Sequence, residues 1–321
     1  MGKNSYLGDY AMVASKGKGA ITTTEIAKLA KKDFKLKGSV ESIRKAISKE
    51  LSRHKLQEVT FSKPKEQVRQ DKFTTPGDYL VLGCLHVPGH NKAMFNGVIE
   101  LIKDMKDLKG LMLIGDFLDM NALSGHNKGQ FTAIPGLTLD GEYKAGNEAL
   151  DKLLINLPKD TSKVYIYGNH EDRWNRYMSD MQNAKAPIKS PKEALYLEER
   201  GFNVFENWSS DYVTLGAHLE LLHGQYYNTH CAKQHIDKLR GSVMFAHTHR
   251  IQMYVEGKTG GFNIGWGGDV SHPFFNYAER GTKTQWMNGF AIVHLDDKGN
   301  YFVNQIFCYD NKFYYNGKTY C

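Results

Sequence analysis

The chain has 321 residues, 41% of them hydrophobic and 12% aromatic, a composition that can bury one sizeable core with a small appendage. No apolar run approaches the roughly 20 residues of a membrane-spanning helix, and the first residues lack a signal-peptide apolar segment, so we expect a cytoplasmic protein. The cysteines lack CxxC spacing, which fits a reducing compartment and argues against a disulfide framework: Cys84, Cys231, Cys308 and Cys321.

The net charge of +7 is concentrated at the front of the chain. Residues 1–77 hold 17 Lys and Arg against eight Asp and Glu, which gives this segment +9 and leaves −2 for the remainder. A basic segment is a reason to look for a polyanionic partner, although a solvated basic tail is a common alternative.

Residues 1–20 are rich in Gly, Ser, Lys and Ala, and we expect them to be flexible. Two short amphipathic helices follow. The first opens at a capping box of Thr22 and Glu25, and the second opens at Ser39. Apolar residues recur at intervals of three and four in both helices and are expected to face one another: Ile26, Leu29, Ala30, Val40, Ile43, Ile47 and Leu51.

Residues 21–55 resemble a helix-turn-helix module, with residues 40–51 as its recognition helix. The outer face of that helix carries small polar and basic groups that fit a major groove, so we predict DNA contacts by Ser42, Arg44, Lys45 and Lys49. The segment between the helices is longer than the usual turn, and a plain helical hairpin is the alternative. Residues 56–77 are predicted to be a linker.

From Asp78 the pattern changes to alternating strands and helices. Strands are predicted at 79–82, 111–114 and 163–167, and helices at 91–106, 142–157 and 174–178. Each of these strands is followed by a glycine and then by potential metal ligands. Because α/β sheets bind ligands at the carboxyl ends of their strands, we expect these side chains to form a site.

The later part of the chain has a different pattern. A hairpin around Gly216 ends in His223, a helix is predicted at 227–239, and a strand at 243–245 ends in Ala246-His247-Thr248-His249. Further hairpins are predicted at 257–260, 297–300 and 316–317, so we expect the tail to be antiparallel β-structure.

Five short motifs stand at these strand ends in sequence order: Cys84-Leu85-His86, Gly115-Asp116-x-x-Asp119, Gly168-Asn169-His170-Glu171, His223-Gly224 and His247-Thr248-His249. Together they resemble the five motifs of the calcineurin-like metallophosphoesterases, the superfamily that includes Mre11-type nucleases, from residue 78 to about residue 270. The resemblance implies an α/β fold with two stacked mixed β-sheets flanked by helices, here in a domain of residues 78–321.

The ligand types fit phosphate ester chemistry. Hydrolysis at neutral pH needs a strong nucleophile and neutralisation of charge on the phosphoryl oxygens, and two divalent cations about 4 Å apart can supply both. Carboxylate, amide and imidazole groups suit Mn, Fe, Zn or Ni. The resemblance implies a first metal held by Cys84, His86, Asp116 and His249, with Asp116 bridging to a second metal held by Asn169, His223 and His247.

The remaining motif residues receive other roles. The resemblance makes His170 an outer-sphere residue that binds the phosphate and protonates the leaving oxygen. Asp119 and Glu171 are expected to orient ligands rather than to bind metal. Arg173 could bind a phosphate oxygen bidentately, or it could form a salt bridge with Asp172 or Glu198.

Cys84 departs from the superfamily pattern, in which the first motif normally begins with Asp. As a thiolate, Cys84 would be a softer ligand that favours Zn or Fe over Mg. As a thiol, it would pack beneath His86 and leave the first metal loosely held. We expect ligation, because neighbouring cations would acidify the thiol.

The sequence therefore predicts a dinuclear-metal phosphoesterase, foremost a phosphodiesterase or nuclease delivered to DNA or another nucleic acid by its basic N-terminal module. One alternative is a phosphatase or nucleotide phosphohydrolase whose N-terminal residues do not bind DNA. Another is a catalytically weakened DNA-binding protein, for which Cys84 is the only sequence support.

Overall fold

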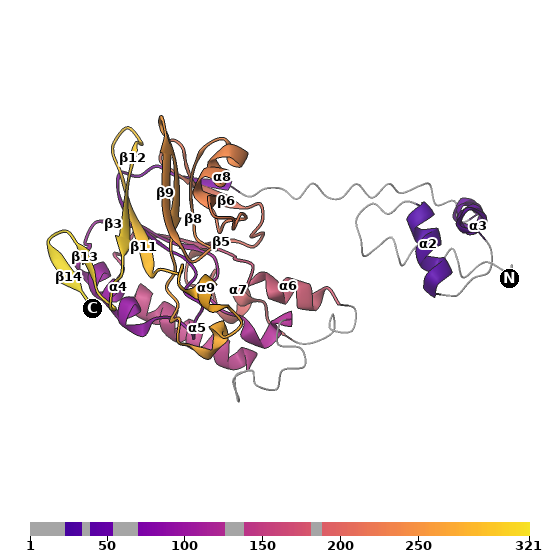
Figure 1. The fold of residues 1–321 in the computed structure, drawn as a ribbon, viewed down its shortest axis with the longest axis horizontal. Helices are drawn as coiled ribbons and strands as arrows, with labels where there is room; N and C mark the ends of the chain where they lie inside the picture. Colours follow the sequence, from indigo (N-terminus) through magenta and orange to yellow (C-terminus); the bar gives the residue numbers. More distant parts are fainter. Residues whose placement is uncertain (1–22, 34–38, 54–69, 126–137, 181–187) are drawn as a thin grey trace. The chain divides into compact units, whose positions relative to one another are not determined.

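A computed structural model describes residues 23–33, 39–53, 70–125, 138–180 and 188–321 (Figure 1). The chain divides into two units, Met1–Gln67 and Val68–Cys321, and each is described by itself. The segment expected to be flexible, residues 1–20, and residues 34–38 between the first two helices lie outside the described residues. Within the described part, no helix combines the length and the apolar character needed to cross a membrane.

The first unit contains the two expected helices, α2 (Thr23–Asp33) and α3 (Val40–Arg53). They pack through a small apolar core in which Ala27 and Ile47 are fully buried. This core is the apolar face that the three- and four-residue spacing predicts, since one helix face repeats every 3.6 residues. The other buried members are Ile26, Ala30 and Ile43.

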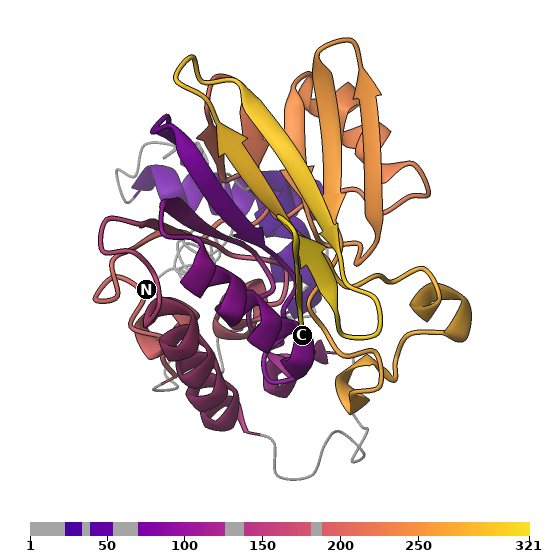
Figure 2. The ribbon, with the colours of Figure 1, turned by 90° about the vertical axis from the view of Figure 1, so that its left-hand side faces the viewer.

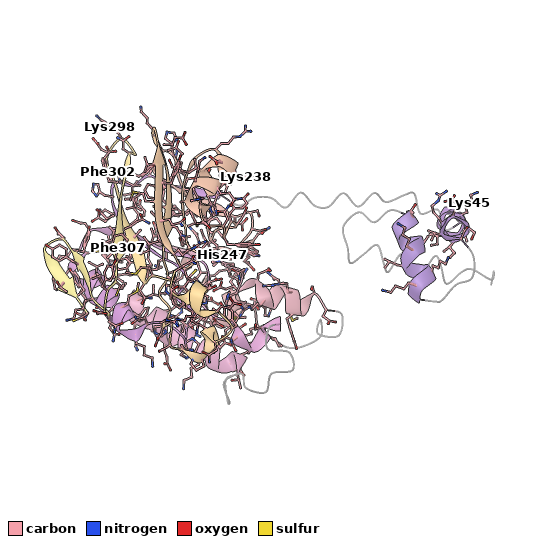
Figure 3. The ribbon with its side chains drawn as sticks, viewed as in Figure 1. Lys45, Lys238, His247, Lys298, Phe302 and Phe307 are labelled. Atoms are coloured by element: carbon pink, nitrogen blue, oxygen red, sulfur yellow. The ribbon has the colours of Figure 1, made fainter. Side chains whose placement is uncertain are left out.

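The outer face of α3 is only partly free for a partner. Arg44 forms an ion pair with Glu41 at 2.6 Å, and the Ser42 hydroxyl donates a hydrogen bond to the Ser39 carbonyl at 2.8 Å. Lys45 projects from the helix and is exposed (Figure 3). The side chain of Lys49 lies outside the described residues. DNA contact by these residues stays a prediction.

The second unit is built on two six-stranded mixed sheets. In sheet 1 the order is β12-β11-β2-β3-β4-β5, with β2 to β5 parallel. In sheet 2 the order is β1-β6-β7-β8-β10-β9. The strands of sheet 1 are β2 (Gly77–Leu82), β3 (Leu108–Ile114), β4 (Ser162–Ile166), β5 (Phe202–Phe205), β11 (Gly289–Leu295) and β12 (Tyr301–Phe307). Those of sheet 2 are β1 (Gln70–Phe73), β6 (Tyr212–Leu215), β7 (Leu219–Leu221), β8 (Ser242–Phe245), β9 (Ile251–Glu256) and β10 (Thr259–Ile264).

The sheets stack face to face between layers of helices (Figure 2). Along β2, Tyr79 and Val81 enter the core between the sheets, whereas Leu80 and Leu82 enter the core beneath the helices, as the two-residue period of a strand requires. Helices α4 (Lys92–Asp104) and α5 (Leu139–Leu154) cover sheet 1, and α8 (Cys231–Leu239) covers sheet 2. The predicted fold class, two stacked mixed sheets flanked by helices, is confirmed.

Several boundaries differ from the expectation. Part of the predicted linker is a strand: β1 pairs in parallel with β6, from Gln70 opposite Tyr212 to Phe73 opposite Leu215. An edge strand needs few apolar residues, so the polar sequence of β1 gave no signal. The helix expected at 227–239 begins at Cys231, and β10 of the expected antiparallel tail also pairs in parallel with β8.

The remaining elements are short. They connect the layers or extend the C-terminal end, where β13 and β14 form a two-stranded ribbon. They are η1 (Asn121–Leu123), α6 (Asp172–Met178), α7 (Pro191–Ala194), η3 (Pro273–Phe275), α9 (Arg280–Lys283), β13 (Phe313–Tyr315) and β14 (Lys318–Tyr320).

Candidate metal centre

The five motifs lie together at the ends of β2, β3, β4, β7 and β8. Backbone hydrogen bonds continue beyond the strands, because the N–H groups of Cys84 and His86 donate to the carbonyls of Gly115 and Asp116 at 2.9 Å each. On sheet 2, the Ala246 N–H donates to the His223 carbonyl at 3.0 Å. These bonds fix the loops that carry the predicted ligands.

Five of the predicted ligands have a left-handed backbone. Non-glycine residues adopt this conformation rarely, and each instance costs on the order of 1–3 kcal/mol. Such strain persists only where the surroundings enforce it, and it concentrates at functional sites. The five φ angles are 51° at Cys84, 53° at His86, 52° at Asp116, 62° at His247 and 59° at His249.

The carboxylate of Asp116 is the centre of the arrangement. Its Oδ2 lies 3.3 Å from His223 Nε2 and 3.9 Å from both His86 Nε2 and His170 Nε2. The Cys84 sulfur lies 4.0 Å from the same oxygen. Asp116 is 1% exposed, so these interactions operate away from bulk water.

Two groups of side chains share Asp116 and could each hold a metal ion. In the first, the ligand atoms of Cys84, His86, Asp116 and His249 all lie within 4.8 Å of one another. In the second, those of Asp116, His223 and His247 do so. Asn169 belongs beside the second group, because its Oδ1 lies 3.0 Å from His223 Nε2. The structure thus brings all seven predicted ligands together, in the two sets that the sequence assigned.

Hydrogen bonds orient the rings of His223 and His86 within the centre. His223 Nδ1 is 3.0 Å from the Ile114 carbonyl, to which it must donate, so Nε2 of the neutral ring carries a lone pair. That lone pair faces oxygen atoms of Asp116 and Asn169, which also accept. His86 Nδ1 likewise donates to Asp119 Oδ2 at 3.1 Å, which turns the Nε2 lone pair toward His249 Nε2 at 3.0 Å. Rings held by their other nitrogen in this way are oriented as metal-binding imidazoles are.

Neighbouring charges and burial shift the pKa values of the centre in different directions. For His223, burial lowers the pKa but the Asp116 carboxylate outweighs it, so the pKa is raised. Burial, reinforced by neighbouring imidazoles, lowers the pKa of His247 to about 3 and that of His249 well below its usual value. For Asp116, burial acts to raise the pKa, but His223 and His170 outweigh it and the pKa lies well below the usual range. The neutral imidazoles and ionised carboxylate are the forms that bind metal.

A third group, His86, Asp119 and His170, is better explained by hydrogen bonds than by a metal ion. His170 Nδ1 lies 2.7 Å from the Asp119 carbonyl and 3.5 Å from Asp119 Oδ2, and His86 reaches the same carboxylate through Nδ1. Asp119 therefore holds both rings on the side away from Asp116. This is the orienting position that the sequence predicted for it.

Glu171 is the other residue expected to orient ligands. Its buried carboxylate accepts the N–H groups of Asp116 at 3.0 Å, Leu118 at 2.9 Å and Gly168 at 2.8 Å, and the Tyr165 hydroxyl at 3.0 Å. One side chain thus ties the loop after β3 to the loop after β4. Gly168 has to be glycine here, because a Cβ would collide with Asp116 Oδ1.

Arg173 makes neither of the salt bridges that the sequence suggested. Its Nη1 donates to the Asp119 carbonyl at 2.8 Å, and its Nη2 lies 3.2 Å from His170 Nε2. Arg176 pairs with Asp172 instead, and Lys192 lies near Glu198. The suggested salt bridges with Asp172 or Glu198 are wrong for Arg173, because α6 directs this side chain back over the loop after β3, where Nη1 lies 3.5 Å from Asp119 Oδ1.

Sequence reasoning missed Glu142 and the tryptophan side chains that lie against two of the predicted metal ligands. Glu142, on α5, is fully buried and accepts the N–H groups of Asn121 at 3.0 Å and Ala122 at 2.8 Å, which anchors the loop after the second motif. Trp266 stacks on His249 with ring centroids 4.6 Å apart, and Trp208 lies 6.2 Å from His247. The run Gly265-Trp266-Gly267-Gly268 was an available signal of close backbone approach.

No family model matches the chain, and no curated protein matches it. Among solved structures, it is similar to vacuolar protein sorting 29 from Cryptosporidium parvum, with 15% identity, 76% of this chain and 97% of that chain covered, and a TM-score of 0.41. It is also similar to wild-type Vps29 complexed with Zn²⁺ from Entamoeba histolytica, with 13% identity, 74% of this chain and 96% of that chain covered, and a TM-score of 0.37. A cold-active protein-tyrosine phosphatase of a Shewanella species has 9% identity, with 74% of this chain and 83% of that chain covered and a TM-score of 0.32. These similarities are too distant to assign a function.

Proposed function

We propose that this protein is a dinuclear-metal-dependent phosphoesterase, and that its substrates are phosphodiesters of nucleic acid. The observation that carries the proposal is that Asp116 belongs to both groups of ligand atoms, so one carboxylate can bridge two ions. The resemblance of the five motifs to calcineurin-like metallophosphoesterases, with the Mre11-type nucleases among them, agrees with this interpretation.

The first ion would be held by Cys84, His86, Asp116 and His249, and the second by Asp116, Asn169, His223 and His247. Two divalent cations there would neutralise charge on the phosphoryl oxygens and lower the pKa of a water nucleophile. Imidazole and thiolate ligands favour Zn, Fe, Mn or Ni over Mg.

Chain residues around the ligands support the remaining steps. His170 Nε2 faces the ligand cluster, 3.9 Å from Asp116 Oδ2, so a ring protonated at both nitrogens can contact a phosphate and transfer the Nε2 proton to the leaving oxygen. Arg173 reaches the same nitrogen and is held by the Asp119 carbonyl. An Arg anchored in this way keeps its planar fork ordered, which reduces the entropic cost of binding a phosphate oxygen.

Turnover of small esters tests the enzymatic proposal. The protein, loaded in turn with Zn, Mn, Fe and Ni, is incubated with p-nitrophenyl phosphate and bis(p-nitrophenyl) phosphate. We expect the diester to be hydrolysed and Asp116→Asn to lose about 10³-fold in rate, as for other groups that organise a whole active centre. Absence of turnover with every metal would contradict the proposal and favour the non-enzymatic DNA-binding alternative.

Nucleic acid as substrate needs its own comparison. Single-stranded DNA, double-stranded DNA and cyclic dinucleotides are offered to the full chain and to a chain that begins at Val68, which keeps β1 in sheet 2. We expect both proteins to hydrolyse small diesters equally and the full chain to cleave DNA faster. Hydrolysis of small esters with DNA untouched would favour a phosphatase or nucleotide phosphohydrolase.

A further inference from the structure

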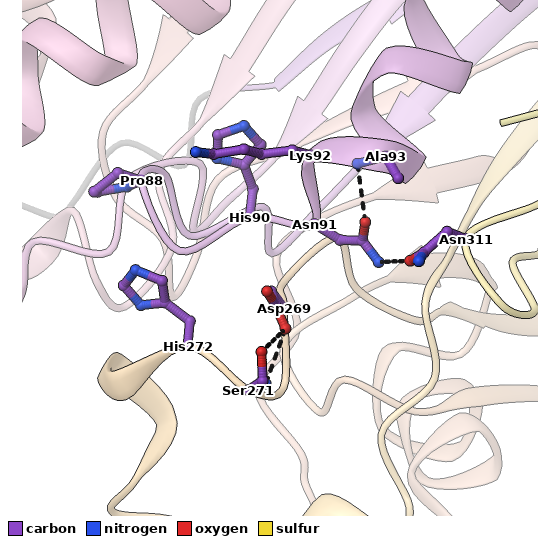
Figure 4. Close-up of a pocket in the computed structure, with 9 residues that line it drawn as sticks. All are labelled: Pro88, His90, Asn91, Lys92, Ala93, Asp269, Ser271, His272 and Asn311. Carbon is purple, nitrogen blue, oxygen red and sulfur yellow. Dashed lines mark hydrogen bonds between the residues drawn. The ribbon is translucent and has the colours of Figure 1, made fainter.

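A polar pocket has a volume of about 510 Å³ (Figure 4). Three segments line it: the loop that leads from β2 into the start of α4, the loop that follows β10, and Asn311 between β12 and β13. The aromatic ring of Phe275 contacts both His86 of the centre, with centroids 5.4 Å apart, and His272 of the pocket, at 6.4 Å. The lining residues are Pro88, His90, Asn91, Lys92, Ala93, Asp269, Ser271, His272 and Asn311.

The pocket presents donors without partners. Lys92 forms no ion pair with a carboxylate of the described residues, and the buried Nδ1 of His90 has no hydrogen-bond partner there. His272 Nδ1 accepts the Phe274 N–H at 3.3 Å, so the neutral ring carries its proton on Nε2, which makes no hydrogen bond to the described residues. His90 Nδ1 is the buried atom of this set, and leaving it without a hydrogen bond is costly unless a ligand satisfies it, whereas Lys92 is exposed.

Asn91 and Asp269 form hydrogen bonds with neighbouring residues of the pocket. The Asn91 side chain accepts the N–H groups of Ala93 and Met94 at 3.1 Å each, so it caps the start of α4 itself. The Asp269 carboxylate accepts from Ser271 N and Oγ at 2.9 and 2.7 Å. Asp269 is the one acidic lining residue, and Lys92 is the one permanent cation. The donors of the pocket that have no partner among the described residues are the Lys92 ammonium and the Nε2–H of His272, and these match an acceptor-rich anion. Asp269 Oδ2 accepts no hydrogen bond from the described residues, so an anion would bind on the side of Lys92 and His272, away from this oxygen.

We propose that this pocket is a subsite for a second phosphate group of the substrate, bound by Lys92, His272 and His90. The inference rests on the proposed phosphoesterase function and narrows its substrates to those that carry a phosphate near the scissile one. The pocket is close enough to the candidate metal centre for one substrate to reach both. His90 of the pocket follows His86 of the centre by four residues, which limits their Cα separation to about 14 Å. A nucleic acid strand carries a phosphate every 3.4 Å of helix axis or so, so a neighbouring phosphate can reach the pocket.

Two matched substrates test the subsite. They are the p-nitrophenyl ester of thymidine 5′-phosphate and the same ester with an added 3′-phosphate. Lys92→Gln removes the cation, and His272→Asn keeps an acceptor for the Phe274 N–H while removing the distant ring N–H. Lys106→Gln, an exposed lysine just beyond α4, is the control.

In the wild-type protein we expect KM to be lower for the ester with two phosphates. Lys92→Gln and His272→Asn should raise that KM about tenfold when combined, the size of one charge-assisted contact, and leave KM for the single-phosphate ester unchanged. Lys106→Gln should behave as the wild type. Equal effects on the two esters, or none on either, would overturn the subsite while leaving the phosphoesterase proposal intact.

A binding measurement separates the two proposals if no ester is hydrolysed. Inorganic pyrophosphate is added to the metal-free protein in the presence of chelator, and the imidazole signals of His90 and His272 are followed by NMR. We expect these signals to shift in the wild type and in Lys106→Gln, and to shift much less in Lys92→Gln. Signals that do not respond in the wild type, or that respond equally in Lys92→Gln, would overturn the subsite.

Discussion

Glu171 holds Asp116 by its backbone, since Glu171 Oε2 accepts the Asp116 N–H at 3.0 Å. The two residues are 55 positions apart, and the same carboxylate accepts three further donors from Leu118, Gly168 and Tyr165. The left-handed backbone of Asp116 is thereby fixed from outside its own loop. The carboxylate that we propose as the bridge thus depends on a residue that belongs to neither group of ligand atoms.

Glu171→Gln should therefore weaken both the fold and the metal centre. Glutamine has one acceptor oxygen and an amide that donates, so it leaves at least one of the buried N–H donors without an acceptor. We expect the free energy of unfolding to fall by about 3 kcal/mol and the bound metal per chain to fall with it. Denaturant titration and elemental analysis measure the two effects. The matched control, Glu148→Gln at an exposed position, should leave the free energy of unfolding and the metal content unchanged. Equal behaviour of the two variants would contradict the role of Glu171 in holding Asp116.

Glu142 should make stability depend on pH near neutrality. Burial raises its pKa from 4.5 to about 7, against the lowering effect of the Ala122 and Asn121 N–H groups. Between these two values the folded protein holds a proton that the unfolded chain has released, so the free energy of unfolding falls as pH rises through this window. The full shift corresponds to about 3 kcal/mol.

The comparison of wild type with Glu142→Gln isolates this contribution, because glutamine does not titrate. Denaturant unfolding is measured from pH 4.5 to pH 8 with chelator present. As pH rises across that range, we expect the free energy of unfolding of the variant to increase relative to that of the wild type by up to about 3 kcal/mol. A stability difference that stays constant with pH would show that the pKa of Glu142 is the same in the folded and the unfolded chain.

The strand ends that carry the motifs could be predicted because three apolar strands end in a glycine followed by polar residues, whereas the ligand roles came from the family resemblance. Arg173 could not be paired correctly, because its partner Asp119 is 54 residues away whereas Asp172 is adjacent. Glu142 gave no signal, since a carboxylate in the first turn of a helix is common and only the packing of α5 against the loop after β3 buries it. β1 was missed because a short edge strand needs no apolar pattern.

Cys84→Asp should retain metal and activity. Burial and the nearby Asp116 raise the pKa of the Cys84 thiol well above its usual value, so only a bound cation would bring it to the thiolate form. Aspartate supplies a carboxylate that is ionised without such help. We expect Cys84→Asp to keep both metals, Cys84→Ala to lose part of the first, and the exposed Cys321→Ser to change nothing. Elemental analysis measures the bound metal, and diester turnover measures the activity. A Cys84→Asp variant that folds but binds no metal would show that the thiol has a role other than metal ligation.

Lys45 should contribute to DNA binding through phosphate contact. It is exposed on α3, whereas Arg44 beside it is already paired with Glu41. If Lys45 neutralises one phosphate, Lys45→Ala should weaken binding to all sequences alike and reduce the slope of log affinity against log salt by about one. Lys28→Ala, an exposed lysine on α2, is the control and should keep the wild-type slope. Fluorescence anisotropy at several salt concentrations measures the slopes, and equal slopes for the two variants and the wild type would remove α3 from the account of DNA binding.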